Sequence, residues 1–210
     1  LSINLEAPNS SYLSELASVK NYTYDLLTRH KWLAEIMPKK HSTQFVVGAA
    51  GESDADIFQT VMTSYEKYDP ARVYYSAFYA VTGTPLENHE NTPLWRANRW
   101  YQVDALLRLY GYERAEASLA FDENGMLTNT DPKILLAKDL PAVDPAAAGY
   151  AELLRVPGIG PVSAGNILKI RELHNVREPE TLRECGVIMK RAMPYLSLSR
   201  TRQTTFASWC

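Results

Sequence analysis

The sequence predicts a mixed α/β protein in which parallel strands alternate with crossover helices, followed by a small all-α module. Strand-like and helix-like segments alternate three times before residue 140. Residues 1–140 carry 13 basic and 18 acidic side chains, net −5, whereas residues 141–210 carry 9 and 6, net +3. A turn rich in proline and glycine lies between two helix-like segments of the second part. We therefore predict an α/β domain over 1–140, a helical module over 141–196 and a loose Ser/Thr-rich tail over 197–210.

Three segments of the first part have strand patterns. Residues 1–6 alternate between apolar and polar side chains, which is typical of a strand with one apolar face. Residues 44–50 form an apolar, β-branched run with Gly48 near its end and Gly51 directly after it, the pattern of a strand buried on both faces. Residues 72–81, rich in aromatic and β-branched side chains, predict a third strand.

Helical patterns lie between these strands. Apolar residues at helical spacing predict one or two helices over residues 11–37. Ser53 followed by Asp56 predicts a capping box at the start of the next helix, and Pro70 ends it. Since each strand is followed by a helix, the strands are expected to be parallel.

A long helix follows the third strand. Thr92 is predicted to cap it, Pro93 to open it and Gly111 to form its C-terminal cap. Its tryptophans fall at core positions, and its arginines are predicted to form a solvated face. The four histidines of the chain are scattered among polar loops and helix ends, so none is predicted to be a ligand.

Composition excludes several classes of protein. The 210 residues are 46% hydrophobic, enough for a proper core, and the net charge of −2 excludes proteins that coat nucleic acid by overall positive charge. Two cysteines cannot build a disulfide framework, and no apolar run approaches the ~18 residues of a membrane span. We expect a soluble, cytoplasmic protein. Because the first residue is leucine, we also expect the chain to be a piece of a longer protein.

The most specific motif is the sequence LLRVPGIGPVSA at residues 153–164. Pro157 fixes one φ angle, Gly158 permits a positive one, and Ile159 can fill the gap between two helices. Gly160 lets a ligand approach the bare backbone, and the proline after it starts the second helix. Free N–H groups at that start, reinforced by the helix dipole, suit a phosphate oxygen and ignore base identity.

A structural explanation of the same motif stays open. The two glycines can also permit tight packing of two antiparallel helices, for contact with protein. Residues 181–191 predict one more helix beneath the hairpin, whose Lys190 and Arg191 either extend the phosphate-binding face or form a solvated helix end. Cys185 is predicted to be a small buried apolar residue and not a nucleophile.

The motif resembles the helix-hairpin-helix of DNA repair and recombination proteins. In chain order, LSINLEAP, QFVVGAAGESD, RVYYSAFYAV with TPL, RWYQVDALLRLYGY and PGIG together resemble the DNA modification/repair radical SAM proteins with a helix-hairpin-helix, over nearly residues 1–196. The resemblance implies the later half of a radical SAM, TIM-like barrel, then a helix-hairpin-helix that binds DNA regardless of sequence. The residues predicted to contact DNA are Arg155, Gly158, Ile159, Gly160, Val162, Ser163, Lys169, Lys190 and Arg191.

The resemblance also implies a cofactor, S-adenosylmethionine. The residues that it assigns to this cofactor are Asn4, Glu6, Gly48, Gly51, Glu52 and Ser76. The first two would hold the ribose or the methionine part, and the others would surround the adenine. Glycines let a flat purine approach the main chain, although glycine and serine are also ordinary residues of strand-to-helix turns.

The chain departs from the family at the iron-sulfur cluster. Family members anchor a 4Fe-4S cluster through a CxxxCxxC loop, whereas this sequence has only Cys185 and Cys210. We therefore expect the chain to be inactive alone and to be the DNA-docking portion of such a repair protein. The alternative is a non-catalytic nucleic-acid-binding module with the α/β part as scaffold. A base-excision glycosylase is disfavoured, because that class needs an aspartate shortly after the hairpin and residues 178–180 offer only Glu-Pro-Glu.

Overall fold

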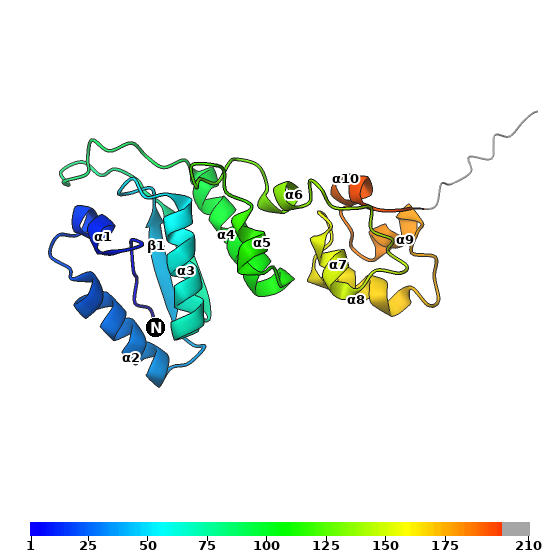
Figure 1. The fold of residues 1–210 in the computed structure, drawn as a ribbon, viewed down its shortest axis with the longest axis horizontal. Helices are drawn as coiled ribbons and strands as arrows, with labels where there is room; N and C mark the ends of the chain where they lie inside the picture. The colour runs from blue at the N-terminus through cyan, green and yellow to red at the C-terminus, as the bar shows by residue number, and fades with distance from the viewer. Residues whose placement is uncertain (199–210) are drawn as a thin grey trace, which may run out of the picture. The chain divides into compact units, whose positions relative to one another are not determined.

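The computed structural model describes residues 1–198 and divides the chain into two compact units, each described separately below (Figure 1). The first unit comprises Leu1–Arg108 and Tyr112–Leu135, and the second comprises Leu109–Gly111 and Leu136–Cys210. The predicted tail lies outside the described residues from 199 onward. Within the described part of that tail, the Ser197 N–H donates to the Val143 carbonyl at 2.8 Å.

The first unit is a mixed α/β structure with a two-stranded parallel sheet. Its elements are α1 (Ser10–Leu16), the π-helix η1 (Tyr22–Leu27), α2 (Thr28–Ile36), β1 (Ser42–Val47), α3 (Asp54–Tyr68), β2 (Arg72–Ala77), α4 (Leu94–Tyr110), α5 (Arg114–Ser118) and α6 (Pro132–Leu136), the last residues of α4 and α6 being counted with the second unit. Among the described residues, no helix is both long enough and apolar enough to cross a lipid bilayer.

The β1–α3–β2 crossover agrees with the sequence prediction. The two strands pair in parallel with Ser42 beside Arg72 and Val47 beside Ala77. The strand spans Ser42–Val47 and not residues 44–50, and the prediction that it is buried on both faces is wrong. Only its alternate side chains are buried, which is typical of a sheet with one face packed against helices. The predicted capping box is present, because Ser53 accepts from the Asp56 N–H at 3.1 Å while the Asp56 carboxylate accepts in return.

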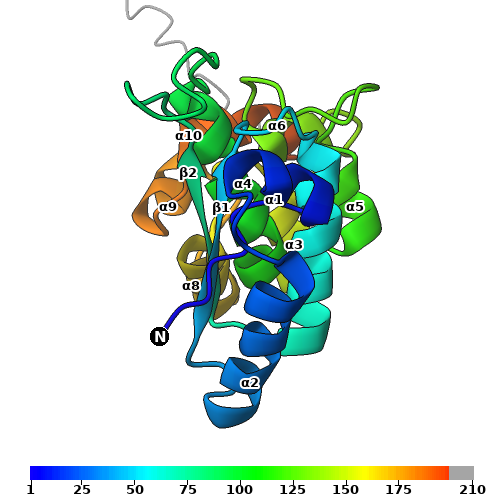
Figure 2. The same ribbon diagram turned by 90° about the vertical axis from the view of Figure 1, so that its left-hand side faces the viewer.

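The prediction of a regular strand over residues 1–6 is wrong in detail. This segment runs parallel to β1 but makes only isolated bridges, from Ser2 to Ser42 and from Glu6 to Phe45 (Figure 2). Between these bridges the Leu5 N–H donates to the side-chain oxygen of Thr43 at 3.2 Å and not to a backbone carbonyl. Glu6 then adopts a positive φ of 65°. A side-chain acceptor and a left-handed residue thus interrupt the ladder.

Two tyrosine hydroxyls occupy the edge of β2 that faces away from β1. The Val73 N–H donates to the Tyr65 hydroxyl at 3.3 Å, and the Tyr75 N–H donates to the Tyr101 hydroxyl at 3.2 Å. These N–H groups would otherwise be free to pair with another strand. The sheet therefore ends at β2 on this side.

The third strand and the long helix differ from prediction at their junction. The strand is shorter than predicted and ends at Ala77, and α4 begins at Leu94. Arg96 is not on a solvated face: it is 9% exposed, and its Nε lies 2.9 Å from a carboxylate oxygen of the fully buried Asp54. Trp100 also donates to Asp54, at 2.6 Å. A buried ion pair with full hydrogen bonding thus joins the start of α3 to α4.

Two histidines are buried together, contrary to the prediction that they lie in polar loops and helix ends. His30 is fully buried and stacks on Tyr68, with ring centroids 4.5 Å apart. His41 packs edge-on against it at 5.1 Å. Both ring nitrogens of His30 lie inside the unit without a hydrogen-bond partner among the described residues. This packing favours neutral imidazole over imidazolium.

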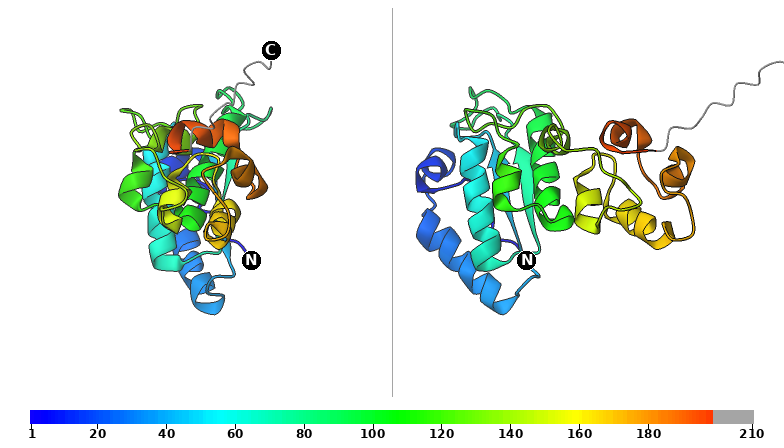
Figure 3. Two further views of the ribbon diagram at one scale, coloured as in Figure 1. Left: turned by 90° about the vertical axis from the view of Figure 1, so that its right-hand side faces the viewer. Right: turned by 45° about the vertical axis from the view of Figure 1, so that its right-hand side comes forward.

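The second unit consists of short helices around one apolar core (Figure 3). They are α7 (Tyr150–Arg155), α8 (Pro161–Ile170), α9 (Pro179–Glu184), α10 (Met189–Ala192) and the 3-10 turn η2 (Met193–Tyr195). The prediction of one helix over 181–191 is wrong. Gly186 adopts a φ of +85° and separates α9 from α10, because a right-handed helix cannot continue through that conformation.

Candidate nucleic-acid interface

The PGIG turn joins α7 to α8 in the predicted conformation. Gly158 has a φ of +90°, which L side chains rarely adopt. Ile159 is 1% exposed and fills the space between the helices. Gly160 is the N-cap of α8, and Pro161 is its first residue. The chain therefore leaves one helix and enters the next within five residues, 156–160.

Gly158 is needed for packing and not for access of a ligand. A Cβ atom at this position would lie 2.6 Å from the Ile188 carbonyl oxygen and 3.0 Å from the Cβ of Arg191. The Ile188 N–H also donates to the Gly158 carbonyl at 2.9 Å. The face of Gly158 is thus covered by the start of α10, which leaves the beginning of α8 as the accessible part of the turn.

The first turn of α8 is exposed to solvent at Val162, whereas Ser163 and Ala164 of the same turn are buried. No side chain caps it, and the first N–H groups of any helix lack intrahelical acceptors. Val162, at the second helical position, is 76% exposed. At Gly160 an added Cβ would meet only the Tyr110 hydroxyl, at an ordinary contact distance of 3.4 Å. Amide donors without a side-chain cap therefore stand beside the exposed Val162, at a helix N-terminus with a positive partial charge.

Ser163 contributes its backbone but not its side chain to this site. Its side chain is buried, and its hydroxyl donates to the Gly186 carbonyl at 2.8 Å. The predicted role of Ser163 in binding is therefore limited to the main chain. The hydroxyl instead fastens α8 to the turn between α9 and α10.

The predicted basic residues are divided between different places. Arg155 donates to the carbonyls of Tyr110 and Gly111, at 3.1 and 3.2 Å, and so caps a helix end. Lys169 lies nine residues after Gly160, or about 13 Å along α8, too far to share a phosphate with the turn. Lys190 is exposed on α10, the helix that packs against the turn.

Gly186 forms a second glycine turn that the sequence prediction missed. The two turns are joined reciprocally: Ile188 donates to the carbonyl of Gly158, and Ser163 donates to the carbonyl of Gly186. The sequence signal was present, since glycine followed by three apolar residues interrupts the helical pattern in ECGVIMK. This arrangement holds Lys190 and Arg191 on the same framework as the PGIG turn.

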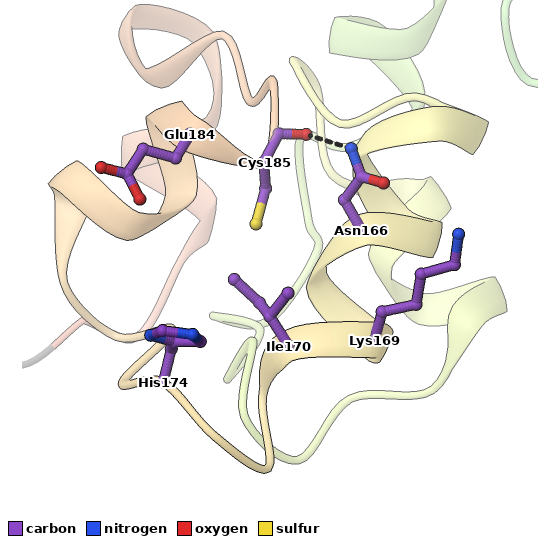
Figure 4. Close-up of a pocket in the computed structure, with 6 residues that line it drawn as sticks. All are labelled: Asn166, Lys169, Ile170, His174, Glu184 and Cys185. Carbon is purple, nitrogen blue, oxygen red and sulfur yellow. Dashed lines mark hydrogen bonds between the residues drawn. The ribbon is translucent and has the colours of Figure 1, made fainter.

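A pocket of about 260 Å³ lies at the other end of α8 (Figure 4). The Cys185 sulfur points into it, and Asn166 donates to the Cys185 carbonyl at 3.2 Å. Burial raises the pKa of the Cys185 thiol, which favours the protonated form, consistent with a small buried apolar residue. Lys169, His174 and Glu184 stand at the rim. No group of three or more metal-ligating side chains occurs among the described residues.

Two of the predicted cofactor residues in the first unit belong to the N-terminal segment. Asn4 accepts a hydrogen bond from the Ser2 hydroxyl at 2.6 Å. Glu6 lies 3.7 Å from Lys20, and its backbone bridges to β1. Both side chains therefore have partners within the unit, and Glu6 has the positive φ described above.

The glycine turn after β1 is filled by its own side chains. The buried Glu52 carboxylate accepts from the Gly48 N–H and, at 3.0 Å, from the Ala50 N–H. A Cβ on Gly48 would lie 2.0 Å from the Thr92 hydroxyl oxygen and 2.9 Å from Arg96. The space beside Gly48 is thus occupied by protein, which leaves no face there for a purine.

The last two predicted cofactor residues, Gly51 and Ser76, have different surroundings. Gly51 faces open space, with a φ of +69°. Ser76, on β2, accepts from the Gln44 side chain at 3.2 Å.

Comparison with known proteins adds no family to these observations. No protein-family model matches the chain, and no curated protein or solved structure is significantly similar to it.

Proposed function

We propose that the second unit binds the backbone of DNA at the start of α8, without reading the bases. The observation that carries this proposal is the first turn of α8, where no side chain caps the amides and Val162 is exposed. Lys190 stands exposed on the helix that packs against the turn. Neutral amides at a positive helix end, with a cation nearby, suit a phosphate.

The proposed contact is small, and this predicts its strength. Backbone contacts of this kind give non-specific dissociation constants of about 10⁻⁴–10⁻⁶ M at physiological salt. If two or three phosphates are neutralised, affinity should fall roughly 12- to 40-fold between 50 and 200 mM salt. Sequence should have little influence, because no base edge is read.

We further propose that the chain is the later part of a DNA modification/repair radical SAM protein with a helix-hairpin-helix. Residues 1–6, β1 and β2 lie side by side in chain order, all parallel, with helical crossovers between them. The tyrosine hydroxyls at β2 end the sheet on that side. The ordered sequence resemblance supports the same assignment.

The cofactor proposed from the resemblance fits this unit poorly. S-adenosylmethionine would need the Gly48 face and the Glu52 carboxylate, and both are engaged with Thr92, Arg96 and backbone amides. We therefore derive no catalytic step. This engagement favours the alternative in which the first unit of this chain is a scaffold for a nucleic-acid-binding module.

The proposal is tested with Val162→Glu in the full chain, measured by fluorescence anisotropy with a labelled duplex. Glutamate in the first turn is compatible with the helix dipole and should leave stability equal or about 0.3–1 kcal/mol higher. It should nevertheless weaken duplex binding at least tenfold, because a carboxylate repels the phosphate. Leu173→Glu, at an 83% exposed site in the same unit, is the matched control for charge.

Two results would oppose the proposal. Equal duplex affinities for the parent and for Val162→Glu would exclude the start of α8 as the contact. A similar loss for Leu173→Glu would show that binding follows overall charge and not this site. Lys190→Gln should produce a smaller loss than Val162→Glu and reduce the salt dependence by about one phosphate.

A further inference from the structure

The helical stretch η1–α2 of the first unit presents an apolar stripe to solvent. Tyr24 and Ile36 are each 76% exposed and Trp32 is 56% exposed. On the opposite side of the same stretch, Leu26 and His30 are buried. The stripe thus faces away from the core, where large apolar side chains have no packing role. We call these three residues the outer stripe.

The π-helix aligns the outer stripe. In a regular α-helix, with 3.6 residues per turn, eight residues separate Tyr24 and Trp32 by a rotation of about 80°. Here the Thr28 N–H bonds to the Thr23 carbonyl, five residues back. This wider turn removes much of that rotation, so Tyr24 and Trp32 lie on one face, about 12 Å apart along the axis. Isolated π-turns of this type often mark functional sites.

Charge is strongly segregated within the first unit. Residues 19–40 carry five basic and two acidic side chains, net +3. The remaining residues of the unit, as bounded above, carry 7 basic and 15 acidic side chains, net −8. Within η1–α2 itself, Arg29 and Lys31 are matched by Asp25 and Glu35, so the surplus comes from Lys20, Lys39 and Lys40 beyond its two ends. A polyanion is therefore repelled by most of this unit and attracted to the two ends of the stretch that carries the outer stripe.

The cations beside the stripe are available to a ligand. Arg29 pairs with Asp25 at 3.3 Å, and Lys31 pairs with Glu35 at 4.0 Å, all on the helix surface. Exposed pairs of this type contribute little to stability, so these side chains can turn to a stronger anion at small cost. Arg29 and Lys31 both precede Trp32 in sequence, by three residues and by one, and their helical positions place them on either side of the stripe.

We propose that the outer stripe binds single-stranded nucleic acid, with unpaired bases stacked on Tyr24 and Trp32 and phosphates near Arg29 and Lys31. Exposed aromatic rings alternating with cations are the usual features of such sites. The stripe has only three apolar side chains, less than an interfacial membrane helix uses. Two copies of a positively charged segment would repel each other, which disfavours self-association. The proposal does not depend on the PGIG turn.

The test measures binding of a fluorescently labelled oligothymidine to the full chain. The parent and every variant carry Val162→Glu, so that the contact proposed at the start of α8 is weakened in all of them. Trp32→Ala should reduce affinity at least about fivefold, whereas Trp32→Phe, which keeps a stacking ring, should change it by less than about twofold. Tyr24→Ala should also weaken binding. Leu119→Ala, at a 75% exposed apolar site of the same unit, should have no effect.

The outcomes separate this proposal from its alternatives and from the proposed function. All substitutions are at exposed sites, and unchanged thermal unfolding confirms that the variants are folded. Equal oligothymidine affinity of Trp32→Ala and the parent overturns the proposal, whatever Val162→Glu does to duplex binding. If Trp32→Ala binds phosphatidylserine vesicles less well than the parent but binds oligothymidine equally well, the stripe is assigned to lipid and the proposal is overturned. If the parent forms a dimer in sedimentation that Trp32→Ala does not form, the stripe is assigned to self-association, which equally overturns the proposal.

Discussion

Replacing Gly158 by alanine should destabilise the second unit by about 2–3 kcal/mol. The φ of +90° lies outside the right-handed region, which costs an L residue about 1–2 kcal/mol. The new Cβ would also lie 2.6 Å from the Ile188 carbonyl oxygen, which is backbone and cannot move aside freely. Relief requires the hydrogen bond between Ile188 and Gly158 to lengthen, at about 1 kcal/mol.

Gly165 provides the matched control, because it lies in the middle of α8 and an added Cβ there would meet nothing within 4 Å. Gly165→Ala should stabilise the unit by about 0.5–1 kcal/mol through helix propensity. Both variants are compared with the parent by native-state hydrogen exchange of the α8 amides, which reports on this unit alone. Equal protection of Gly158→Ala and the parent would refute the proposed close packing between the PGIG turn and α10.

Three further predictions concern buried groups. Burial lowers the pKa of His30 to about 4 from the usual 6.5, so the unfolded chain binds the proton more readily than the folded one. The free energy of unfolding should therefore be highest above about pH 6.5 and fall by up to about 3 kcal/mol as the pH drops towards 4. Urea titrations at pH 7.5 and 4.5 should show a smaller loss for His30→Phe than for the parent. Asp54→Ala should cost about 3–5 kcal/mol in the same assay, because it leaves Arg96 buried without its carboxylate, and a loss below 1 kcal/mol would contradict the buried pair. The Cys185 thiol, whose pKa burial raises, should react with iodoacetamide at pH 7.4 more slowly than a free cysteine, as followed by mass spectrometry of its peptide.

The sequence predicted those parts of the fold that local rules decide. The β1–α3–β2 unit follows from alternating strand and helix patterns, and its capping box at Ser53 and Asp56 is confirmed. Gly111 has the positive φ expected directly after a helix end. These features depend on residues within a few positions of each other, so a single sequence contains the necessary information.

Errors occurred where distant residues decide the outcome. The ladder at residues 1–6 is interrupted by a side chain from β1, and Arg96 is buried because a carboxylate 42 positions away accepts from it. Neither partner can be identified from periodicity. His30 and His41 were likewise placed in polar surroundings, whereas the fold stacks them inside the first unit.

The candidate site shows the same division. The conformation of the PGIG turn and the burial of Ile159 follow from residue type alone. The partners of Arg155 and Ser163 do not, since both bind carbonyls of segments remote in sequence. Sequence reasoning thus predicted the backbone conformation of the turn but not the partners of the polar side chains around it.

The hydroxyls of Tyr65 and Tyr101 affect how readily this protein can associate through the free edge of β2. Because they accept hydrogen bonds from the Val73 and Tyr75 amides on the outer side of β2, these two donors are not free to pair with a strand of a neighbouring molecule. A phenylalanine at either tyrosine would free one of these two amides for pairing with an added strand.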